Sequence, residues 1–174
     1  MADTVGESAL DDGLAGGGGV DGGRFREVLG HFATGVTIVT AAEDGEPVGF
    51  TCQAFTSLSL EPPLVALAPA KSSTSWPRIA KAGSFCVNIL GDDQEAVCRD
   101  FAVSGGDKFR GIGWHAGVTG SPILDGALAW VECAFVEAHD AGDHEFVIGR
   151  VLDLGVVPGR PLLYYRGGFG RFEP

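Results

Sequence analysis

The sequence predicts a mainly β protein, a barrel with a few peripheral helices rather than a parallel doubly wound sheet. Many short apolar or alternating segments are separated by closely spaced turns, and only a few stretches have helical spacing. No GxGxxG opens a helix after the first strand and no GxxxxGK[ST] occurs, which argues against the common nucleotide folds. With 174 residues, 45% of them hydrophobic, the chain is long enough for one domain with a real core.

The N-terminal segment differs in composition from the rest of the chain. Residues 1–23 are rich in Gly and Asp and contain no Lys or Arg, so we expect a disordered acidic tail ahead of a folded domain at 24–174. Apolar residues from Phe25 to Phe32 then recur on one helical stripe. We expect this helix to pack on the core.

Strands account for most of the predicted domain. Glu43–Pro47 and Asp140–Asp143 have the composition of hairpin turns. The expected strands are Val36–Ala41, Val48–Cys52, Thr56–Leu60, Leu64–Ala68, Phe85–Leu90, Leu128–Ala138, His144–Leu154 and Leu162–Arg166.

Two further short helices are predicted between the strands. Pro77 suits the first turn of a helix for which Ser75 is the N-cap. Asp92 and Glu95 have the spacing of a capping box, which predicts a helix that ends near Ala102. A glycine-rich loop follows at 104–109.

Charge and cysteine content exclude several classes of function. The formal charge of −11 argues against nucleic acid and anionic membranes as partners. No apolar run approaches the ~20 residues of a membrane span and no signal peptide opens the chain, so we expect a cytoplasmic protein. The four cysteines form no CxxC pair, which favours buried free thiols over a zinc or redox site. We therefore predict no metal.

Two polar segments are candidates for one wall of a binding site. Residues 51–59 carry five hydroxyl or amide side chains within an otherwise apolar strand pattern. Lys71–Ser75 combines one lysine with four hydroxyls, a set of donors that can satisfy a phosphate. From the residues alone, a surface loop with helix-capping serines explains this second segment equally well.

The stretch Phe50–Leu64, FTCQAFTSLSLEPPL, resembles the signature of flavin reductases that serve two-component flavin-dependent monooxygenases. A Ser/Thr cluster, a FxVNxL strand, a GDH hairpin and a terminal aromatic-x-G segment follow in the family's order. The resemblance covers residues 25–172. One departure is that Cys52 and Gln53 replace the family's usual small residues.

The resemblance implies a fold and an activity. The fold is an FMN-binding split barrel, a homodimer whose site takes residues from both chains. The activity is hydride transfer from NADH to FAD, with FMN possible, and release of reduced flavin by diffusion to a separate monooxygenase. A non-catalytic flavin-binding or electron-transfer protein of the same barrel, or a barrel whose flavin site has lapsed, remains an alternative. The absence of a second basic cluster favours NADH over NADPH.

The resemblance also implies which residues form the site. His144 is expected beside the flavin ring, where it orients the nicotinamide or balances the charge of reduced flavin; a hairpin histidine taken alone is more often a turn residue. Arg166 and Phe169 are expected on the nicotinamide side, and the 101–109 loop over an adenine. The expected cofactor-binding residues are Phe50, Thr51, Cys52, Gln53, Ala54, Ser57, Lys71, Ser72, Ser73, Thr74, Ser75, Phe101, Lys108, Phe109, His144, Arg166 and Phe169.

Overall fold

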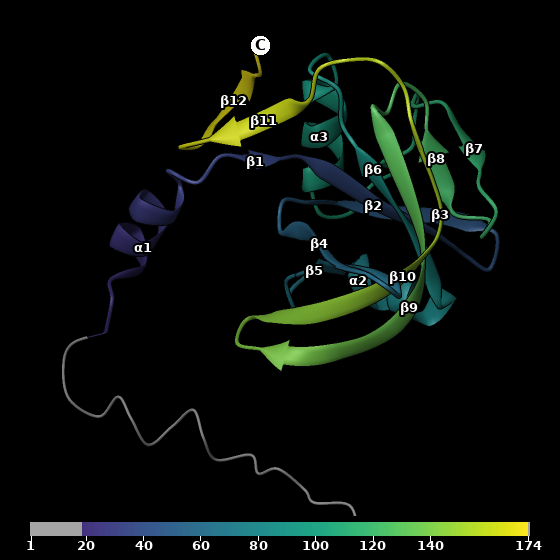
Figure 1. The fold of residues 1–174 in the computed structure, drawn as a ribbon, viewed down its shortest axis with the longest axis horizontal. Coiled ribbons are helices and arrows are strands. Elements are labelled where there is room, and N and C mark those ends of the chain that lie inside the picture. The colour runs from purple at the N-terminus through teal and green to yellow at the C-terminus, as the bar shows by residue number, and fades with distance from the viewer. Residues whose placement is uncertain (1–18, 174) are drawn as a thin grey trace, which may run out of the picture.

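The computed structural model describes residues 19–173 as a mainly β protein with three helices in that range, as predicted (Figure 1). The tail predicted at residues 1–23 lies mostly outside the described residues, and Gly22 and Gly23 already belong to the first helix. The helices are α1 (Gly22–Leu29), α2 (Trp76–Ala82) and α3 (Glu95–Ala102). The strands are β1 (Thr34–Gly35), β2 (Thr37–Glu43), β3 (Glu46–Cys52), β4 (Phe55–Leu60), β5 (Pro63–Leu67), β6 (Ser84–Ile89), β7 (Trp114–Ala116), β8 (Pro122–Leu124), β9 (Ala129–Ala141), β10 (His144–Val156), β11 (Leu162–Tyr165) and β12 (Gly168–Arg171).

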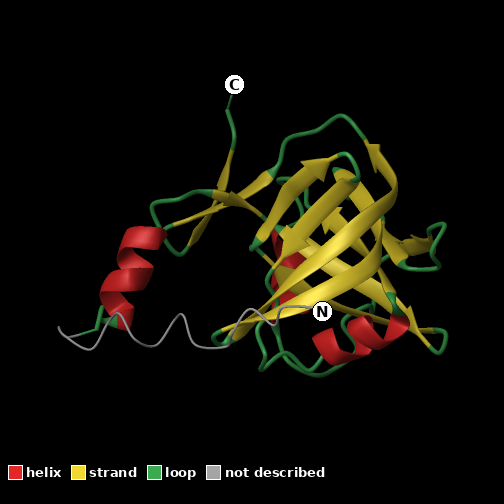
Figure 2. Cartoon of the chain, turned by 60° about the horizontal axis from the view of Figure 1, so that its bottom comes forward, coloured by secondary structure: helices red, strands yellow, loops and turns green. Residues whose placement is uncertain are grey.

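One strongly curved sheet of seven strands dominates the body (Figure 2). Its order is β3-β2-β6-β9-β10-β5-β4, and all its pairs are antiparallel. The two edge strands, β3 and β4, follow each other in sequence and are joined by Gln53 and Ala54. Because the described ladders do not pair β3 with β4, the motif residues at this joint lie where the sheet is open.

Two apolar clusters cover the two faces of the central strands. Val39 and Val87 belong to the cluster that packs against Trp76 and Ile79 of α2. Ile38, whose side chain points to the other face of the sheet, belongs to the cluster around α3. Adjacent residues of a strand point to opposite faces, so burial on both faces produces the continuous apolar run of β2.

Helix α1 differs most from its prediction. It begins at Gly22 with Asp21 as N-cap, whose carboxylate accepts from the Arg24 amide at 2.9 Å. None of its residues is buried, and Figures 1 and 2 both show it standing apart from the sheet. The expectation that its apolar stripe packs on the core of the same chain is therefore wrong.

Neither predicted helix cap forms as its pattern suggested. Ser75 occupies the N-cap position of α2 without a capping bond, and Ser73 accepts from the Trp76 amide instead, at 3.1 Å. At α3 the N-cap is Gln94, not Asp92. The Asp92 carboxylate is 3.1 Å from the Arg160 guanidinium, an ion pair that competes with the local capping box.

The remaining elements were either predicted or too short to leave a pattern. The β9–β10 hairpin turns at Gly142 and Asp143, and Gly142 has a left-handed φ of 72° that suits a tight turn. Strands β1, β7, β8 and β12 were not predicted; the final strand was expected to be Leu162–Arg166. All four cysteines are buried and free, as expected. Within residues 19–173, no helix has the length and apolar character needed to cross a membrane.

Candidate functional site

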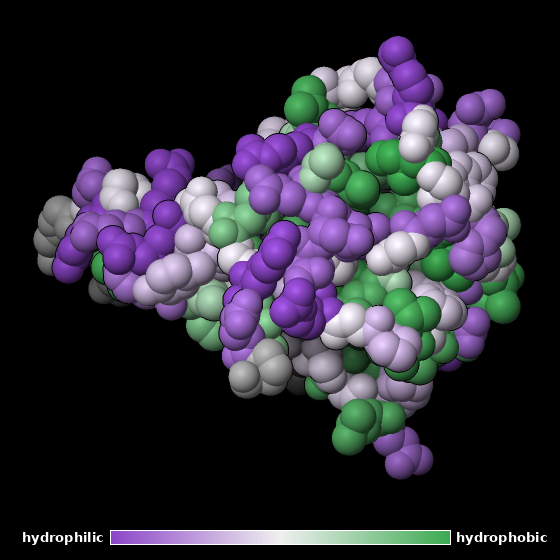
Figure 3. Space-filling view, turned by 90° about the horizontal axis from the view of Figure 1, so that it is seen from above, coloured by the Kyte–Doolittle hydropathy of each residue, from purple (hydrophilic) through white to green (hydrophobic). Residues whose placement is uncertain are grey.

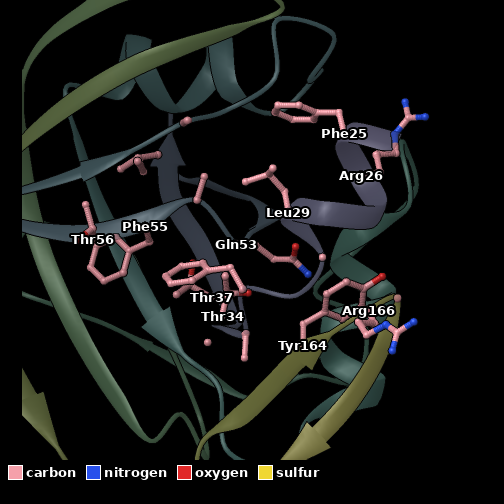
Figure 4. Close-up of a pocket in the computed structure, with 18 of the residues that line it drawn as sticks. Phe25, Arg26, Leu29, Thr34, Thr37, Gln53, Phe55, Thr56, Tyr164 and Arg166 are labelled. Carbon is pink, nitrogen blue, oxygen red and sulfur yellow. The ribbon is translucent and has the colours of Figure 1, made fainter. Parts of the chain in front are cut away.

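A large hollow lies at the open joint between β3 and β4 (Figure 4). It encloses about 1300 Å³ between α1, the β3–β4 joint, β5, β10 and the β11–β12 turn. Pockets for one drug-sized ligand measure roughly 300–1,000 Å³, so this hollow has room for two planar ring systems. Of the predicted site residues, Gln53, Ala54 and Arg166 line it.

The floor of this hollow consists of small and apolar side chains held in register by the sheet. The Ala68 amide donates to the Ala54 carbonyl at 2.9 Å, which aligns β5 with the β3–β4 joint. Phe146 follows on β10, next to the Val147–Leu67 pair. Such a floor accepts a flat ring because alanine side chains leave the backbone accessible.

Polar groups are placed along the wall above this floor. The Thr34 hydroxyl is buried there and has no hydrogen-bond partner in the described part of the chain. The Thr37 hydroxyl donates to the Cys52 carbonyl at 2.6 Å, which fixes β2 against the end of β3. Figure 4 shows the Gln53 amide directed toward the same side as Arg166. An orphaned hydroxyl beside an exposed amide suits a ligand with carbonyl and ring-nitrogen edges.

The three predicted residues of β3 point away from this hollow. Phe50 and Cys52 are buried in the core, and the Phe50 ring meets the Trp76 ring edge-on at 6.5 Å. Burial raises the pKa of the Cys52 thiol to about 11, which leaves it unreactive at neutral pH. The Thr51 hydroxyl donates to the Cys98 carbonyl of α3 at 2.8 Å. Through these contacts with the core and with α3, the three residues hold the β3–β4 joint in place without lining the hollow.

A second, smaller hollow of about 610 Å³ lies at the other end of β3. Thr74, Ser75, Lys108 and Phe109 line it. The Lys108 ammonium lies 3.2 Å from the Gly49 carbonyl, and its pKa is lowered because it is partly desolvated. The same ammonium donates to the Phe101 carbonyl at 3.1 Å and lies 3.5 Å from the Ser75 hydroxyl, and the acidic residues Glu46 and Asp107 also line this hollow.

The Lys71–Ser75 segment does not act as one cluster. Lys71 forms an ion pair with Asp140 of the β9–β10 hairpin, and its amide donates to the Asp143 carbonyl at 2.9 Å. Ser72 is exposed, and the Ser73 hydroxyl caps α2. Thr74 and Ser75 remain as the pair that faces the second hollow.

His144 begins β10, two residues before Phe146. Alternate residues of a strand share a face, about 7 Å apart, so His144 lies on the face that Phe146 presents to the large hollow. Its Nδ1 is 2.7 Å from the Asp143 carboxylate, whose pKa is lowered by that hydrogen bond. With Nδ1 engaged, Nε2 is the ring nitrogen that remains for a ligand.

Three further predicted residues, Ser57, Phe101 and Phe169, do not line the large hollow. Ser57 is exposed on β4. The Phe101 ring is buried and meets Phe109 edge-on at 5.0 Å. Phe169 packs on Tyr164, and the Arg99 guanidinium lies 5.1 Å from its ring centre.

Several lining residues were not predicted, among them Arg26, Thr34, Thr37, Phe146 and Tyr164. Phe146 follows the GDH motif and Tyr164 comes directly before the terminal aromatic-x-G segment, so these motifs could have indicated them. Arg26 and Thr34 had no such signal, because they meet the site only through the arrangement of α1 and β1.

Comparison with known proteins shows the family to which the chain belongs. Residues 29–173 match the model of the flavin reductase like domain. The chain is 49% identical over 164 residues to the reductase subunit HsaB of a flavin-dependent monooxygenase from Rhodococcus jostii, covering 94% of this chain and 84% of the relative.

Two solved structures are also similar. Nitrilotriacetate monooxygenase component B from Mycobacterium thermoresistibile superposes with a TM-score of 0.84 at 51% identity, over 86% of each chain. The NADH:FAD oxidoreductase SgcE6 from Streptomyces globisporus, in complex with NAD and FAD fragments, gives a TM-score of 0.82 at 37% identity, over 87% of this chain and 92% of that one.

Proposed function

The chain belongs to the flavin reductase family, and from this premise we propose that it is an NADH-dependent flavin reductase. It reduces FAD, or FMN, and releases the reduced flavin to a separate flavin-dependent monooxygenase. The observation that carries this proposal is the large hollow at Gln53 and Ala54, which has room for two ring systems. Bound flavin supplies the hydride acceptor, because no protein side chain can carry a hydride.

The residues of the large hollow fit this role. Ala54 and Ala68 leave backbone and floor open to the flat face of a ring, while Gln53 and Thr34 offer polar partners for its edge. The protein's own contribution is to hold two rings in near-attack geometry, where effective molarity supplies several kcal/mol of the barrier. We assign His144 to orientation of the nicotinamide from the neighbouring strand.

We assign the end of the flavin that lies farthest from its ring to the second hollow. Thr74, Ser75 and Lys108 present two hydroxyls and one ammonium there. Strand β3 connects the two hollows, since it begins at one and ends at the other. The hollows are open and hold the flavin without a covalent link, which suits a product that must leave by diffusion.

We further propose that the curved sheet is a split barrel and that two copies form a homodimer. Leu154 and Val156 occupy one face of β10 and are 65% and 75% exposed, and Leu152, at a register shift of the same strand, is 53% exposed. Figure 3 shows apolar areas, in green, open on the body. Exposed apolar patches of this kind mark interfaces. A cytoplasmic location is consistent with four unpaired cysteines.

Replacing Leu154 with Asp is expected to convert the dimer to monomer, because a charge in the centre of an apolar interface is left desolvated and unpaired. Size-exclusion chromatography with light scattering measures the mass directly. Asp153 to Asn, on the opposite face of the same strand, is the matched control and leaves the mass unchanged. A wild-type monomer at micromolar concentration contradicts the proposed dimer.

The function is tested by NADH oxidation with FAD and FMN supplied separately. We expect turnover with added free flavin, with FAD giving the higher kcat/KM, and little turnover without it. A protein that quenches flavin fluorescence yet does not oxidise NADH supports the non-catalytic alternative. If the protein binds neither FAD nor FMN, the proposed function is wrong.

A further inference from the structure

Two arginines at the rim of the large hollow have no acidic partner. Arg26 of α1 and Arg166 of the β11–β12 turn both line it. Neither guanidinium lies within 4.0 Å of a carboxylate belonging to residues 19–173. Glu27, the acidic residue nearest in sequence, instead pairs with Arg24 at 3.0 Å. Figure 4 shows Arg26 beside Phe25 and Arg166 beside Tyr164, at the two ends of one side of the hollow.

Backbone hydrogen bonds through Gly30 join the end of α1 to the β11–β12 turn. The Gly30 amide donates to the Arg26 carbonyl at 2.9 Å, and the Arg166 amide donates to the Gly30 carbonyl at 3.0 Å. A Cβ at Gly30 would lie 2.9 Å from the Arg26 carbonyl oxygen and 3.6 Å from the Arg166 Cα. Glycine at this position therefore permits the close approach of α1 and the β11–β12 turn.

Arg166 occupies a backbone conformation that its side chain disfavours. Its φ is +49°, and Gly167 follows at +82°, so the pair forms the tight turn between β11 and β12. Asn and Gly are the residues usual at such positions. Strain of this kind at the rim of a binding hollow indicates a role for the side chain rather than for the turn.

Because the whole protein is acidic, two arginines without acidic partners point to a site for an anion. At a formal charge of −11, the protein repels anions unless a local set of donors attracts them. Guanidinium groups bind phosphate oxygens through two parallel N–H bonds. Two such groups beside a hollow for flat rings match a ligand that joins a ring to a pair of phosphates.

We propose that Arg26 and Arg166 together bind the diphosphate of a dinucleotide whose ring enters the large hollow. This inference rests on the proposed function, which supplies two such molecules, NADH and FAD. In this arrangement α1 is part of the substrate site. Its position apart from the sheet leaves the hollow open for the dinucleotide to enter.

The test uses three variants and ligands with and without a diphosphate. Arg26→Gln removes one charge from an exposed helix position, and Arg166→Asn removes the other while it keeps a residue that tolerates positive φ. Arg150→Gln is the matched control, since Arg150 is exposed, has no acidic partner among the described residues and lines neither hollow. The measurements are KM for NADH, KM for reduced nicotinamide mononucleotide, and the Kd of FAD and of FMN by fluorescence quenching.

We expect each variant to raise KM for NADH, or Kd for FAD, by about tenfold, the effect of losing one charge-assisted contact. The values for reduced nicotinamide mononucleotide and FMN, which lack a diphosphate, should change by less than about threefold. A change confined to NADH identifies the nicotinamide dinucleotide as the ligand, and one confined to FAD identifies the flavin.

Two results with the arginine variants, and one with the control, overturn the proposal. In one, NADH and FAD are both unaffected; in the other, mononucleotides lose as much affinity as dinucleotides. An equal loss in Arg150→Gln shows a general charge effect and has the same consequence. Wild-type protein that fails to oxidise NADH contradicts the proposed function instead, and the FAD arm, which needs no turnover, still tests the arginine pair. The melting temperature of Arg166→Asn should not fall, because Asn tolerates the positive φ that the turn requires at this position.

Discussion

Replacing His144 with Ala is expected to lower kcat/KM for NADH by about a hundredfold and to change the Kd of flavin by less than about threefold. The imidazole is held by the Asp143 carboxylate at 2.7 Å and lies on the face of β10 that Phe146 presents to the large hollow. Removing it should leave the floor at Ala54 and Ala68 intact, so flavin still binds. Stopped-flow reduction of bound flavin by NADH, with a separate flavin titration, measures the two quantities.

Two further variants separate orientation from packing. His144→Gln keeps a hydrogen-bonding side chain and should restore part of the rate. His115→Ala is the control, since His115 is exposed on β7 and lines neither hollow. The assignment is wrong if His144→Ala weakens flavin binding as much as it slows turnover, because the histidine would then act on the flavin alone.

The secondary structure could be predicted because its determinants are local. Alternation along β9 and β10, and the Gly142–Asp143 turn between them, fix a hairpin without reference to the rest of the chain. The order of motifs from Phe50 onward likewise predicted the family. Boundaries moved by one to three residues, where strand pairing extends or ends a local pattern.

Features that depend on distant partners could not be predicted. Asp92 has the spacing of a capping residue, but Arg160, far along the chain, pairs with its carboxylate. The stripe of α1 predicted a packed helix because periodicity shows that a face is apolar and not what covers it. The hydroxyls of Lys71–Ser75 separate in space, since Ser73 caps α2 while Thr74 and Ser75 face the second hollow.

Glu132 is the clearest feature that sequence reasoning missed. It sits inside a strand pattern with no polar neighbour that would indicate a partner, yet it is completely buried. Its carboxylate accepts from the Val118 amide at 2.8 Å, the Thr119 amide at 2.9 Å and the Thr119 hydroxyl at 2.6 Å. A Cβ at Gly117 would overlap this carboxylate, so the turn is shaped around it. The segment between β7 and β8 thus depends on one side chain of β9.

Replacing Glu132 with Ala is expected to lower the free energy of unfolding by about 3–5 kcal/mol, because three donors lose one buried, charge-assisted acceptor. That is a large part of the total stability of about 5–15 kcal/mol that a domain of this size has. Glu132→Gln keeps the shape but turns an amide group toward N–H donors, so it should cost less. Urea unfolding measures both changes from the midpoint and slope.

Glu137→Gln provides the matched control, since Glu137 lies exposed on the same strand and should change stability by less than about 0.5 kcal/mol. Gly117→Ala disturbs the same contact, because the added methyl group would overlap the Glu132 carboxylate. Because the added methyl and the carboxylate compete for one space, its cost should be smaller in the Glu132→Ala background than in wild type. Strictly additive costs, or a loss below about 1 kcal/mol for Glu132→Ala, would show that the β7–β8 turn is held by its backbone alone.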